Sequence, residues 1–217
     1  MLDRHLVPHL KAPLGRIART LHERGVSADQ VSVAGFAIGL GAVAAAALGA
    51  PLVALAFLLL NRLADGIDGE LARIVGSSDA GAFLDIVLDF VFYALFPLGF
   101  ALADPEANAL PAAALVASFV ATGSSFLAFA GQAERYGITH PEFGYKGLYY
   151  LDGLAEGTET ILCFVLFCLL PEAFPTIAWA FAALCVVTAA NRIVSGHRTL
   201  RQVRTGGIAP AEKEPRA

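Results

Sequence analysis

DGIDGELARIVGSSDAGAFLDIVLD, residues 65–89, places two pairs of aspartates in an otherwise apolar stretch of the chain. Asp65 and Asp68 are three residues apart, and Asp85 and Asp89 are four apart. If both ends of this segment are helical, each pair projects from one face of its helix, because residues three or four apart are neighbours there. Two helices are therefore expected to present four carboxylates to one shared space.

The composition indicates the class of protein in which these acids lie. The chain has 217 residues, of which 57% are hydrophobic and 16% are charged. This is too apolar and too poor in charge for an ordinary soluble domain, so an integral membrane protein is predicted. No nucleic-acid partner is expected. The three cysteines lie in apolar segments without metal-ligand spacing, and are expected to serve only packing.

Hydrophobic periodicity predicts an all-α membrane protein with six transmembrane helices. Residues 1–30 alternate leucines with basic side chains at helical spacing, which is typical of an amphipathic helix on the membrane surface. Asp29 is expected to cap the first span. Residues 31–193 form the transmembrane domain, and the polar segment 194–217 is expected to be a disordered cytoplasmic tail. Five of the predicted spans cover about 31–50, 82–103, 109–131, 154–170 and 174–193. The second begins at residue 51 or 52, has only about a dozen apolar residues before Asn61, and is expected to carry a polar end to the interface or into a cavity.

The placement of lysine and arginine predicts the orientation. These residues fall in the N-terminal segment, near the second-to-third and fourth-to-fifth connections, and after the last span. The other connections carry none. By the positive-inside rule, both termini and the connection that bears the aspartates face the cytoplasm in this multi-pass membrane protein.

Facing carboxylates repel one another unless cations neutralise them. Ligand sets made only of oxygen suit Mg²⁺ or Mn²⁺, and two such ions ~4 Å apart can support displacement at phosphorus. Gly69 and Gly81 remove bulk beside the acids, and Arg73 offers a cation for phosphate. A cation or proton pathway is the rival interpretation. Transporters usually place such sites near the midplane between repeated halves, whereas here the acids lie at one end and no repeat is visible.

The motif itself resembles a family signature. Asp65-x-x-Asp68-Gly69-x-x-Ala72-Arg73, followed by Gly81-x-x-x-Asp85-x-x-x-Asp89, matches every defining position of the CDP-alcohol phosphotransferase family. The resemblance implies that a CDP-linked donor binds beside the motif and that an alcohol attacks the donor phosphorus, which releases CMP. It also implies a homodimer, since dimerisation is typical of that family.

The resemblance assigns roles residue by residue. Asp65, Asp68 and Asp85 would hold two divalent cations, Mg²⁺ or Mn²⁺. Asp89 would complete this metal site and act as the general base on the acceptor hydroxyl. Gly69, Ala72 and Gly81 would leave room for the nucleotide, while Arg73 supports the site or the diphosphate.

The acceptor is less well indicated. Lys146 and Arg192 are candidates for binding an acceptor phosphate, although Arg192 could equally be an interfacial anchor at the end of the last span. The sequence does not decide whether Glu156 and Glu159 contact substrate. The predicted function is transfer of a phosphatidyl group from CDP-diacylglycerol to a small polar alcohol, with a glycerol-phosphate- or inositol-phosphate-like acceptor favoured. The alternatives are headgroup transfer from a CDP-amino alcohol to diacylglycerol, and a non-enzymatic cation carrier.

Overall fold

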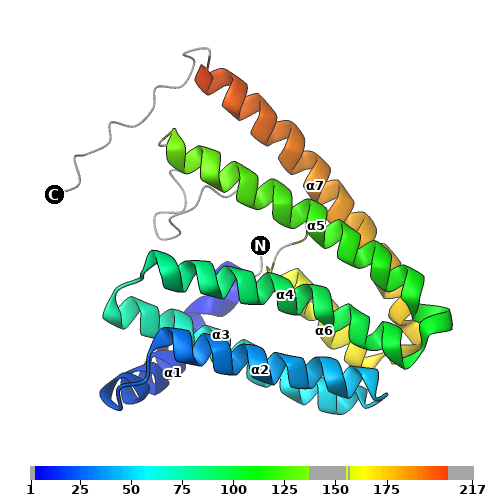
Figure 1. The fold of residues 1–217 in the computed structure, drawn as a ribbon, viewed down its shortest axis with the longest axis horizontal. Coiled ribbons are helices and arrows are strands. Elements are labelled where there is room, and N and C mark those ends of the chain that lie inside the picture. The colour runs from blue at the N-terminus through cyan, green and yellow to red at the C-terminus, as the bar shows by residue number, and fades with distance from the viewer. Residues whose placement is uncertain (1–2, 137–154, 156, 205–217) are drawn as a thin grey trace. The chain divides into compact units, whose positions relative to one another are not determined.

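The fold of the chain was determined as a computed structural model, which describes residues 3–136, 155 and 157–204 (Figure 1). These residues form α-helices and one short 3₁₀ turn, so the predicted all-helical class is confirmed. The elements are α1 (Asp3–Glu23), α2 (Ala28–Ala47), α3 (Pro51–Val75), α4 (Asp79–Ala103), α5 (Pro105–Arg135), α6 (Gly157–Leu169), η1 (Pro171–Ala173) and α7 (Phe174–Arg204).

Four of the described helices are long and apolar enough to cross a membrane, namely α2, α4, α5 and α7. α6 is apolar but has only 13 residues. α3 is as long as α4 but carries charged side chains over its second half. The chain divides into two compact units, one of residues 1–116 and 156–181 and the other of residues 117–155 and 182–217. The aspartates belong to the first unit.

α2 begins earlier than predicted because Ser27 caps it. The Ser27 hydroxyl accepts a hydrogen bond from the backbone N–H of Gln30 at 3.2 Å, and the Gln30 side chain accepts one from the Ser27 N–H at 3.1 Å. This reciprocal pair satisfies two helix-end donors at once. The prediction that Asp29 is the cap was therefore wrong. Asp29 lies instead in the first turn, where the helix dipole favours a negative charge.

α3 continues well past the apolar run in which the second span was predicted. The charged and polar residues after Asn61 include good helix formers, so the helix persists to Val75. Gly76 ends it with a φ of 98°, a conformation that suits glycine. Ser78 then caps α4 by accepting from the Gly81 N–H at 3.0 Å. Asp65 and Asp68 consequently lie on a continuous helix.

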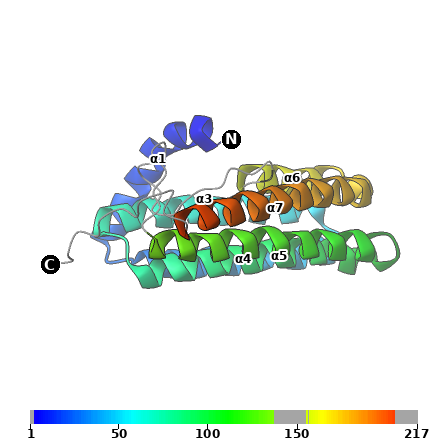
Figure 2. The ribbon, with the colours of Figure 1, turned by 90° about the horizontal axis from the view of Figure 1, so that it is seen from above.

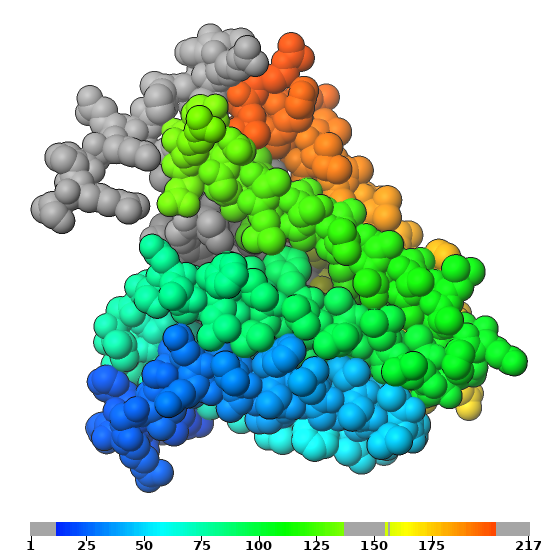
Figure 3. Space-filling view, viewed as in Figure 1, coloured from blue at the N-terminus to red at the C-terminus, as the bar shows by residue number. Residues whose placement is uncertain are grey.

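α2 packs along both α3 and α4, and in the space-filling view α2 and α4 abut along their length (Figure 3). Small residues on α2 and α4 permit this approach. A Cβ added at Gly39 would lie 2.9 Å from the Phe92 ring, and one at Gly99 would lie 2.7 Å from the Val43 carbonyl oxygen. α2 therefore acts as the common support of the two helices that carry the acids.

Beyond the acids, the first unit is filled by aromatic side chains, here called the phenylalanine cluster. Its rings come from three helices, and the ring centroids of contacting pairs lie 4.5 Å (Phe167 to Phe174) to 6.3 Å (Phe92 to Phe164) apart. All its members are buried. They are Phe92, Phe96 and Phe100 of α4, Phe164 and Phe167 of α6, and Phe174 at the start of α7.

α1 is set at a steep angle to the helices it packs against (Figure 2). Its Ala18 is buried against Ile67 and Leu71 of α3. Leu14 fits over Gly66, where an added Cβ would come within 2.9 Å of a Leu14 methyl group. The predicted N-terminal amphipathic helix thus packs its apolar side on the segment that carries Asp65 and Asp68.

In the second unit, the later parts of α5 and α7 bury several polar side chains. The Thr188 hydroxyl accepts a hydrogen bond from the Ala155 N–H at 3.0 Å. Arg192 is only 7% exposed, and its guanidinium lies 5.7 Å from the Phe126 ring centroid. α7 remains helical to Arg204, whereas a disordered tail was predicted from residue 194. Basic side chains near its C-terminus favour this extension, because they complement the helix dipole.

Candidate active site

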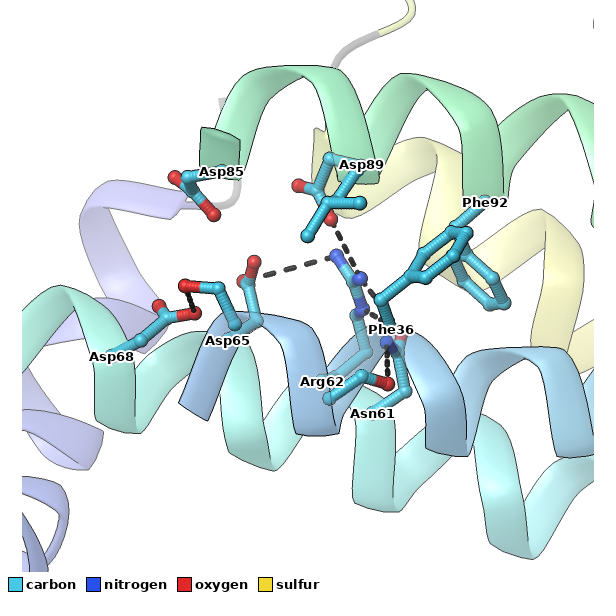
Figure 4. A pocket seen from close by; sticks show the side chains of 11 residues that line it. Phe36, Asn61, Arg62, Asp65, Asp68, Asp85, Asp89 and Phe92 are labelled. Carbon is cyan, nitrogen blue, oxygen red and sulfur yellow. Dashed lines mark hydrogen bonds and ion pairs between the residues drawn. The ribbon is translucent and has the colours of Figure 1, made fainter. Parts of the chain in front are cut away.

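The four aspartates of the motif lie on two helices and turn toward one space (Figure 4). Asp65 and Asp68 project from α3, and Asp85 and Asp89 project from the first turns of α4. One carboxylate oxygen from each of Asp65, Asp68 and Asp85 lies within 4.8 Å of the others. We call these three residues the carboxylate triad. Asp68 is the most enclosed of them, at 5% exposure.

α2 contributes a hydrogen bond to the triad. The Ser32 hydroxyl donates to Oδ2 of Asp68 at 2.7 Å. This bond fixes the orientation of the Asp68 carboxylate. Helices α2, α3 and α4 therefore all take part in positioning the triad.

Asp89 is held differently, because its carboxylate is paired with Arg62. Nη2 of Arg62 lies 2.8 Å from Oδ1 of Asp89, and Nη1 lies 3.8 Å from Oδ2 of Asp65. The sequence placed Asp89 among the metal ligands as well as in the role of base. In the structure its side chain is bound to a guanidinium at one end of the triad.

Further contacts fix Arg62 in this position. Its Nε and Nη2 donate to Oδ1 of Asn61 at 2.9 and 2.7 Å, and its Nη1 donates to the Tyr93 hydroxyl at 3.2 Å. Asn61 in turn donates to the Gly35 carbonyl oxygen at 2.8 Å. The guanidinium carbon lies 5.3 Å from the Phe92 ring centroid, which is within range of a cation–π contact.

A groove of about 350 Å³ leads away from the triad. Asp68 and Asp85 belong to both the triad and the groove wall. Gly69, Ala72 and Gly81, which the motif assigned to the nucleotide, all line this groove. Its remaining described lining residues are the cap residue Ser27, then Ala28, Asp29 and Ser32 of α2, and Val75, Gly76, Ser77, Ser78 and Ala82.

The two motif glycines in the groove, Gly69 and Gly81, have different surroundings. Around a Cβ built on Gly69, no atom of the described residues lies within 4 Å, so this position opens into the groove. A Cβ on Gly81 would lie 3.1 Å from Oδ1 of Asp29 and 3.1 Å from the Ser78 hydroxyl. Gly81 therefore lets the Asp29 carboxylate approach α4, in addition to lining the groove.

The remaining predicted residues are not described as part of this site. Arg73 is not among the groove-lining residues; its side chain is 55% exposed and pairs with Glu70 one turn earlier. Lys146 and Glu156 lie outside the described residues. Arg192 belongs to the second unit, where it lies beside Phe126. Glu159 lies half-buried in the first turn of α6.

Sequence reasoning missed Arg62, Asn61, Ser32 and Asp29 as site residues. Arg62 carried a signal, because it precedes Asp65 by three residues and so shares its helical face. Asp29 was noticed only as a helix cap. Ser32 and Asn61 gave no signal, since their importance depends on how α2 packs against α3.

The chemistry of the triad fits a divalent cation. Its donors are all carboxylate oxygens, which suit hard ions such as Mg²⁺ and Mn²⁺. Three carboxylates that approach within 4.8 Å repel one another, and a bound cation relieves that repulsion. The residues present therefore form a suitable site for at least one such ion.

Known proteins are similar to this chain in sequence. The profile of the CDP-alcohol phosphatidyltransferase family matches residues 26–190. Inner membrane protein YnjF of Escherichia coli K12 is 52% identical over 204 residues, which cover 94% of this chain and 99% of that protein. Archaetidylinositol phosphate synthase of Pyrococcus horikoshii is 36% identical over 96 residues, 44% of this chain and 51% of that protein.

Solved structures with a similar fold come from phosphatidylinositol phosphate synthase of Mycobacterium tuberculosis. The structure with CDP-DAG bound has a TM-score of 0.63 and 22% sequence identity, and the match covers 94% of this chain and 98% of that one. The structure with manganese and citrate has a TM-score of 0.61 and 21% identity, over 94% of this chain and 93% of that one.

Proposed function

The chain belongs to the CDP-alcohol phosphatidyltransferase family, and on that premise we propose that it transfers a phosphatidyl group from CDP-diacylglycerol to a small polar alcohol. The observation that carries this proposal is the carboxylate triad at the end of a groove lined by Gly69, Ala72 and Gly81. The groove offers space for a nucleotide beside a cation site. The synthase of similar fold from M. tuberculosis was solved with CDP-DAG bound, which supports this choice of donor.

In this proposal Asp65, Asp68 and Asp85 hold the metal. A bound Mg²⁺ or Mn²⁺ would neutralise charge on the donor diphosphate and make the acceptor hydroxyl more acidic. A second ion, as predicted from the sequence, would need Asp89 as a ligand. Asp89 is paired with Arg62, so that ion would have to compete with the guanidinium.

Asp89 is the proposed general base. The acceptor oxygen forms a bond to the phosphatidyl phosphorus, while the bond from that phosphorus to the bridging oxygen breaks. CMP leaves with the bridging oxygen, and the hydroxyl proton passes to the Asp89 carboxylate. Asp89 suits this step because it lies at the end of the triad without belonging to it.

A phosphorylated polyol is the favoured acceptor. The curated archaeal relative is an archaetidylinositol phosphate synthase, and the solved relative is a phosphatidylinositol phosphate synthase. Such an acceptor needs a cation for its own phosphate. Lys146 and Arg192 remain the proposed residues for that role, and Arg73 remains proposed for the donor diphosphate.

The proposed arrangement in the membrane has six crossings. α3 and α6 would cross in addition to the four long apolar helices, and the polar half of α3 would emerge at the cytoplasmic face. A cell inner membrane location is supported by the name of the E. coli relative. The active site and both termini lie on the cytoplasmic side in this proposal, and two copies of the chain form a homodimer.

The test is CMP release by the purified, full-length protein. CDP-diacylglycerol and Mg²⁺ or Mn²⁺ are supplied with a panel of acceptors that includes glycerol 3-phosphate and inositol phosphate. We expect release that depends on the acceptor and is lost in Asp89→Asn. Asp79→Asn is the matched control, because Asp79 is an exposed acid at the start of the same helix and does not line the groove.

Other outcomes select the alternatives. Release only from CDP-choline or CDP-ethanolamine with diacylglycerol would replace the proposal with headgroup transfer. Bound metal without release from any donor would favour the cation carrier.

A further inference from the structure

The N-terminal helix α1 packs against the part of α3 that carries two acids of the carboxylate triad. Ala18 of α1 is 0% exposed and is buried with Ile67 and Leu71 of α3. We call this contact the α1 core; the side chains packed around it are Leu14, Leu21, Ala28 and Val31. Arg16 and Arg19, on the other side of α1, are exposed. The apolar side of α1 therefore lies against α3.

The turn after α1 fixes the direction of this helix relative to α2. The Gly25 N–H donates to the His22 carbonyl oxygen at 2.9 Å, and the Val26 N–H donates to the Leu21 carbonyl oxygen at 3.0 Å. This pair of bonds ends a helix with a residue in the left-handed conformation, and Gly25 supplies it with a φ of 76°. The orientation of α1 is therefore set by directed bonds as well as by apolar packing.

α1 and α4 lie on opposite sides of α3, as Figures 1 and 2 both show. The acids of α3 face those of α4 across the site (Figure 4). At about 100° per residue, the α3 residues next to α1 centre on a side of the helix roughly opposite to Asp65 and Asp68. These residues are Gly66, Ile67, Glu70 and Leu71. The α1 core is therefore placed behind the two acids of α3.

The acids of the triad repel one another, and this repulsion tends to separate α3 from α4. Oxygens of Asp65, Asp68 and Asp85 lie within 4.8 Å of one another. Like charges at this spacing destabilise the arrangement in the absence of a cation. A displacement of α3 away from α4 would compress the α1 core. Because close-packed interiors are hardly compressible, α1 opposes that displacement.

We propose that α1 is a positioning element of the metal site, with Ala18 as the positioning residue at its centre. The α1 core holds the acids of α3 close to those of α4, so that a cation binds without first drawing the two helices together. Ala18 has no ligand atom and acts only through α3. The proposal rests on the proposed function only in that Asp65, Asp68 and Asp85 bind a divalent cation.

The experiment compares Mn²⁺ affinities in the absence of any substrate. The full-length protein is placed in nanodiscs of phosphatidylcholine, whose zero net charge does not attract the ion. It is titrated with Mn²⁺ and followed by the free-ion electron paramagnetic resonance signal. Ala18→Gln inserts a polar side chain into the α1 core and retains good helix propensity. We expect the affinity to fall by about tenfold or more, because the ligands remain but are no longer held in place.

Ile17→Gln is the matched control. Ile17 precedes Ala18 on the same helix but is 42% exposed, so the same new side chain lies outside the α1 core. This variant should bind Mn²⁺ with the native affinity. A purely structural role of Ala18 would lower the melting temperature in the presence of a chelator and leave the Mn²⁺ affinity of the folded protein unchanged. The two measurements therefore separate positioning from stability.

A second pair of variants changes the orientation of α1 without altering its core. Gly25 and Gly49 have φ values of 76° and 70°, and no described atom lies within 4 Å of a Cβ built on either. Valine strains the backbone at both positions. Only Gly25 joins α1 to α2, whereas Gly49 lies between α2 and α3. We expect Gly25→Val to weaken Mn²⁺ binding by about tenfold and Gly49→Val to leave it unchanged.

Native Mn²⁺ affinity in folded Ala18→Gln would overturn the proposal, and so would an equal loss of affinity in Ile17→Gln. If Ala18→Gln does not fold, the two glycine variants decide. Equal affinities in Gly25→Val and Gly49→Val would then contradict the role of α1. A native protein that binds no Mn²⁺ would also contradict it.

These results can be told apart from those that test the transfer reaction. If the affinities change as expected but no donor yields CMP, the proposed function fails and the role of α1 stands. If CMP is released but Ala18→Gln binds Mn²⁺ as the native protein does, the role of α1 fails and the proposed function stands.

Discussion

The two ends of α4 are built from opposite kinds of side chain. Its first turns carry Asp85 and Asp89, which face the acids of α3. Its later turns carry Phe96 and Phe100, which are buried among other rings. Phe92 lies at the boundary, with Arg62 over its ring and Phe96 at a centroid distance of 5.6 Å.

This difference separates stability from function along one helix. Facing carboxylates repel, so the acidic end contributes little to folding in the absence of a cation. The aromatic end supplies packing, because buried rings contribute both area and specific contacts. The comparison predicts that substitutions at the acidic end abolish activity without unfolding the protein. Substitutions at the aromatic end should lower the stability of the fold and leave the metal site of the folded protein intact.

The largest effect is expected for Asp85→Asn. Losing one of three ligands should reduce CMP release by about a thousandfold or more, since charge stabilisation in the transition state depends on the metal. The melting temperature in the presence of a chelator should not fall, because one repelling charge is removed. A clear drop in that melting temperature would show that the acidic end also stabilises the fold.

The second largest effect is a loss of stability, expected for Phe96→Ala at the aromatic end of α4. Phe96→Ala removes a ring that is 0% exposed and lies 4.7 Å from Phe164, measured between ring centroids. The free energy of unfolding, measured by detergent denaturation, should fall by about 3–5 kcal/mol. Mn²⁺ affinity of the folded fraction should be unchanged. Phe83→Ala on the same helix is the control, because Phe83 is 69% exposed.

Gly69→Leu should separate stability from function further, because it should stabilise helix α3 while its side chain blocks the groove. Replacing a helical glycine stabilises by up to about 1 kcal/mol, and the added side chain enters open space. We expect the KM for CDP-diacylglycerol to rise about tenfold or more, with Mn²⁺ binding unchanged. Gly131→Leu, at another helical glycine with no described atom near its added Cβ, should leave this KM unaltered.

The smallest effect is expected for Ser32→Ala. It removes the hydrogen bond to Asp68 but none of the ligands, so Mn²⁺ affinity should weaken about tenfold. Ser124→Ala is a suitable comparison, because the Ser124 hydroxyl bonds within its own helix. Equal metal affinity in the native protein and Ser32→Ala would show that α2 does not help to hold the triad.

The sequence predicted the shared space of the aspartates because helical spacing determines which residues share a face. Arg62 could not be assigned in the same way. The spacing predicts that Arg62 shares a helical face with Asp65. Its partners Asp89 and Tyr93, however, come from a different helix, whose register depends on how α2 packs. The prediction that this helix carries a polar end beyond its short apolar run is confirmed, because α3 continues through Asp65 and Asp68. Its last residue was not predicted, since the sequence after Asn61 has no apolar periodicity that would indicate where the helix ends. The cap of α2 was assigned to Asp29 although Ser27 and Gln30 form the stronger reciprocal pair.

The uninterrupted course of α3 has a consequence for the depth of the proposed reaction if this helix crosses the bilayer. Asp65 lies fourteen positions after Pro51, which is about 21 Å of helix at ~1.5 Å per residue. If α3 crosses from Pro51, Asp65 lies about 9 Å short of the far edge of a ~30 Å hydrocarbon layer. The donor phosphates must then sink below the headgroup level. We expect activity in reconstituted bilayers to fall as the acyl chains lengthen from myristoyl to eicosenoyl, because a thicker leaflet places the site deeper. Activity that rises steadily over this series would contradict the depth that α3 implies.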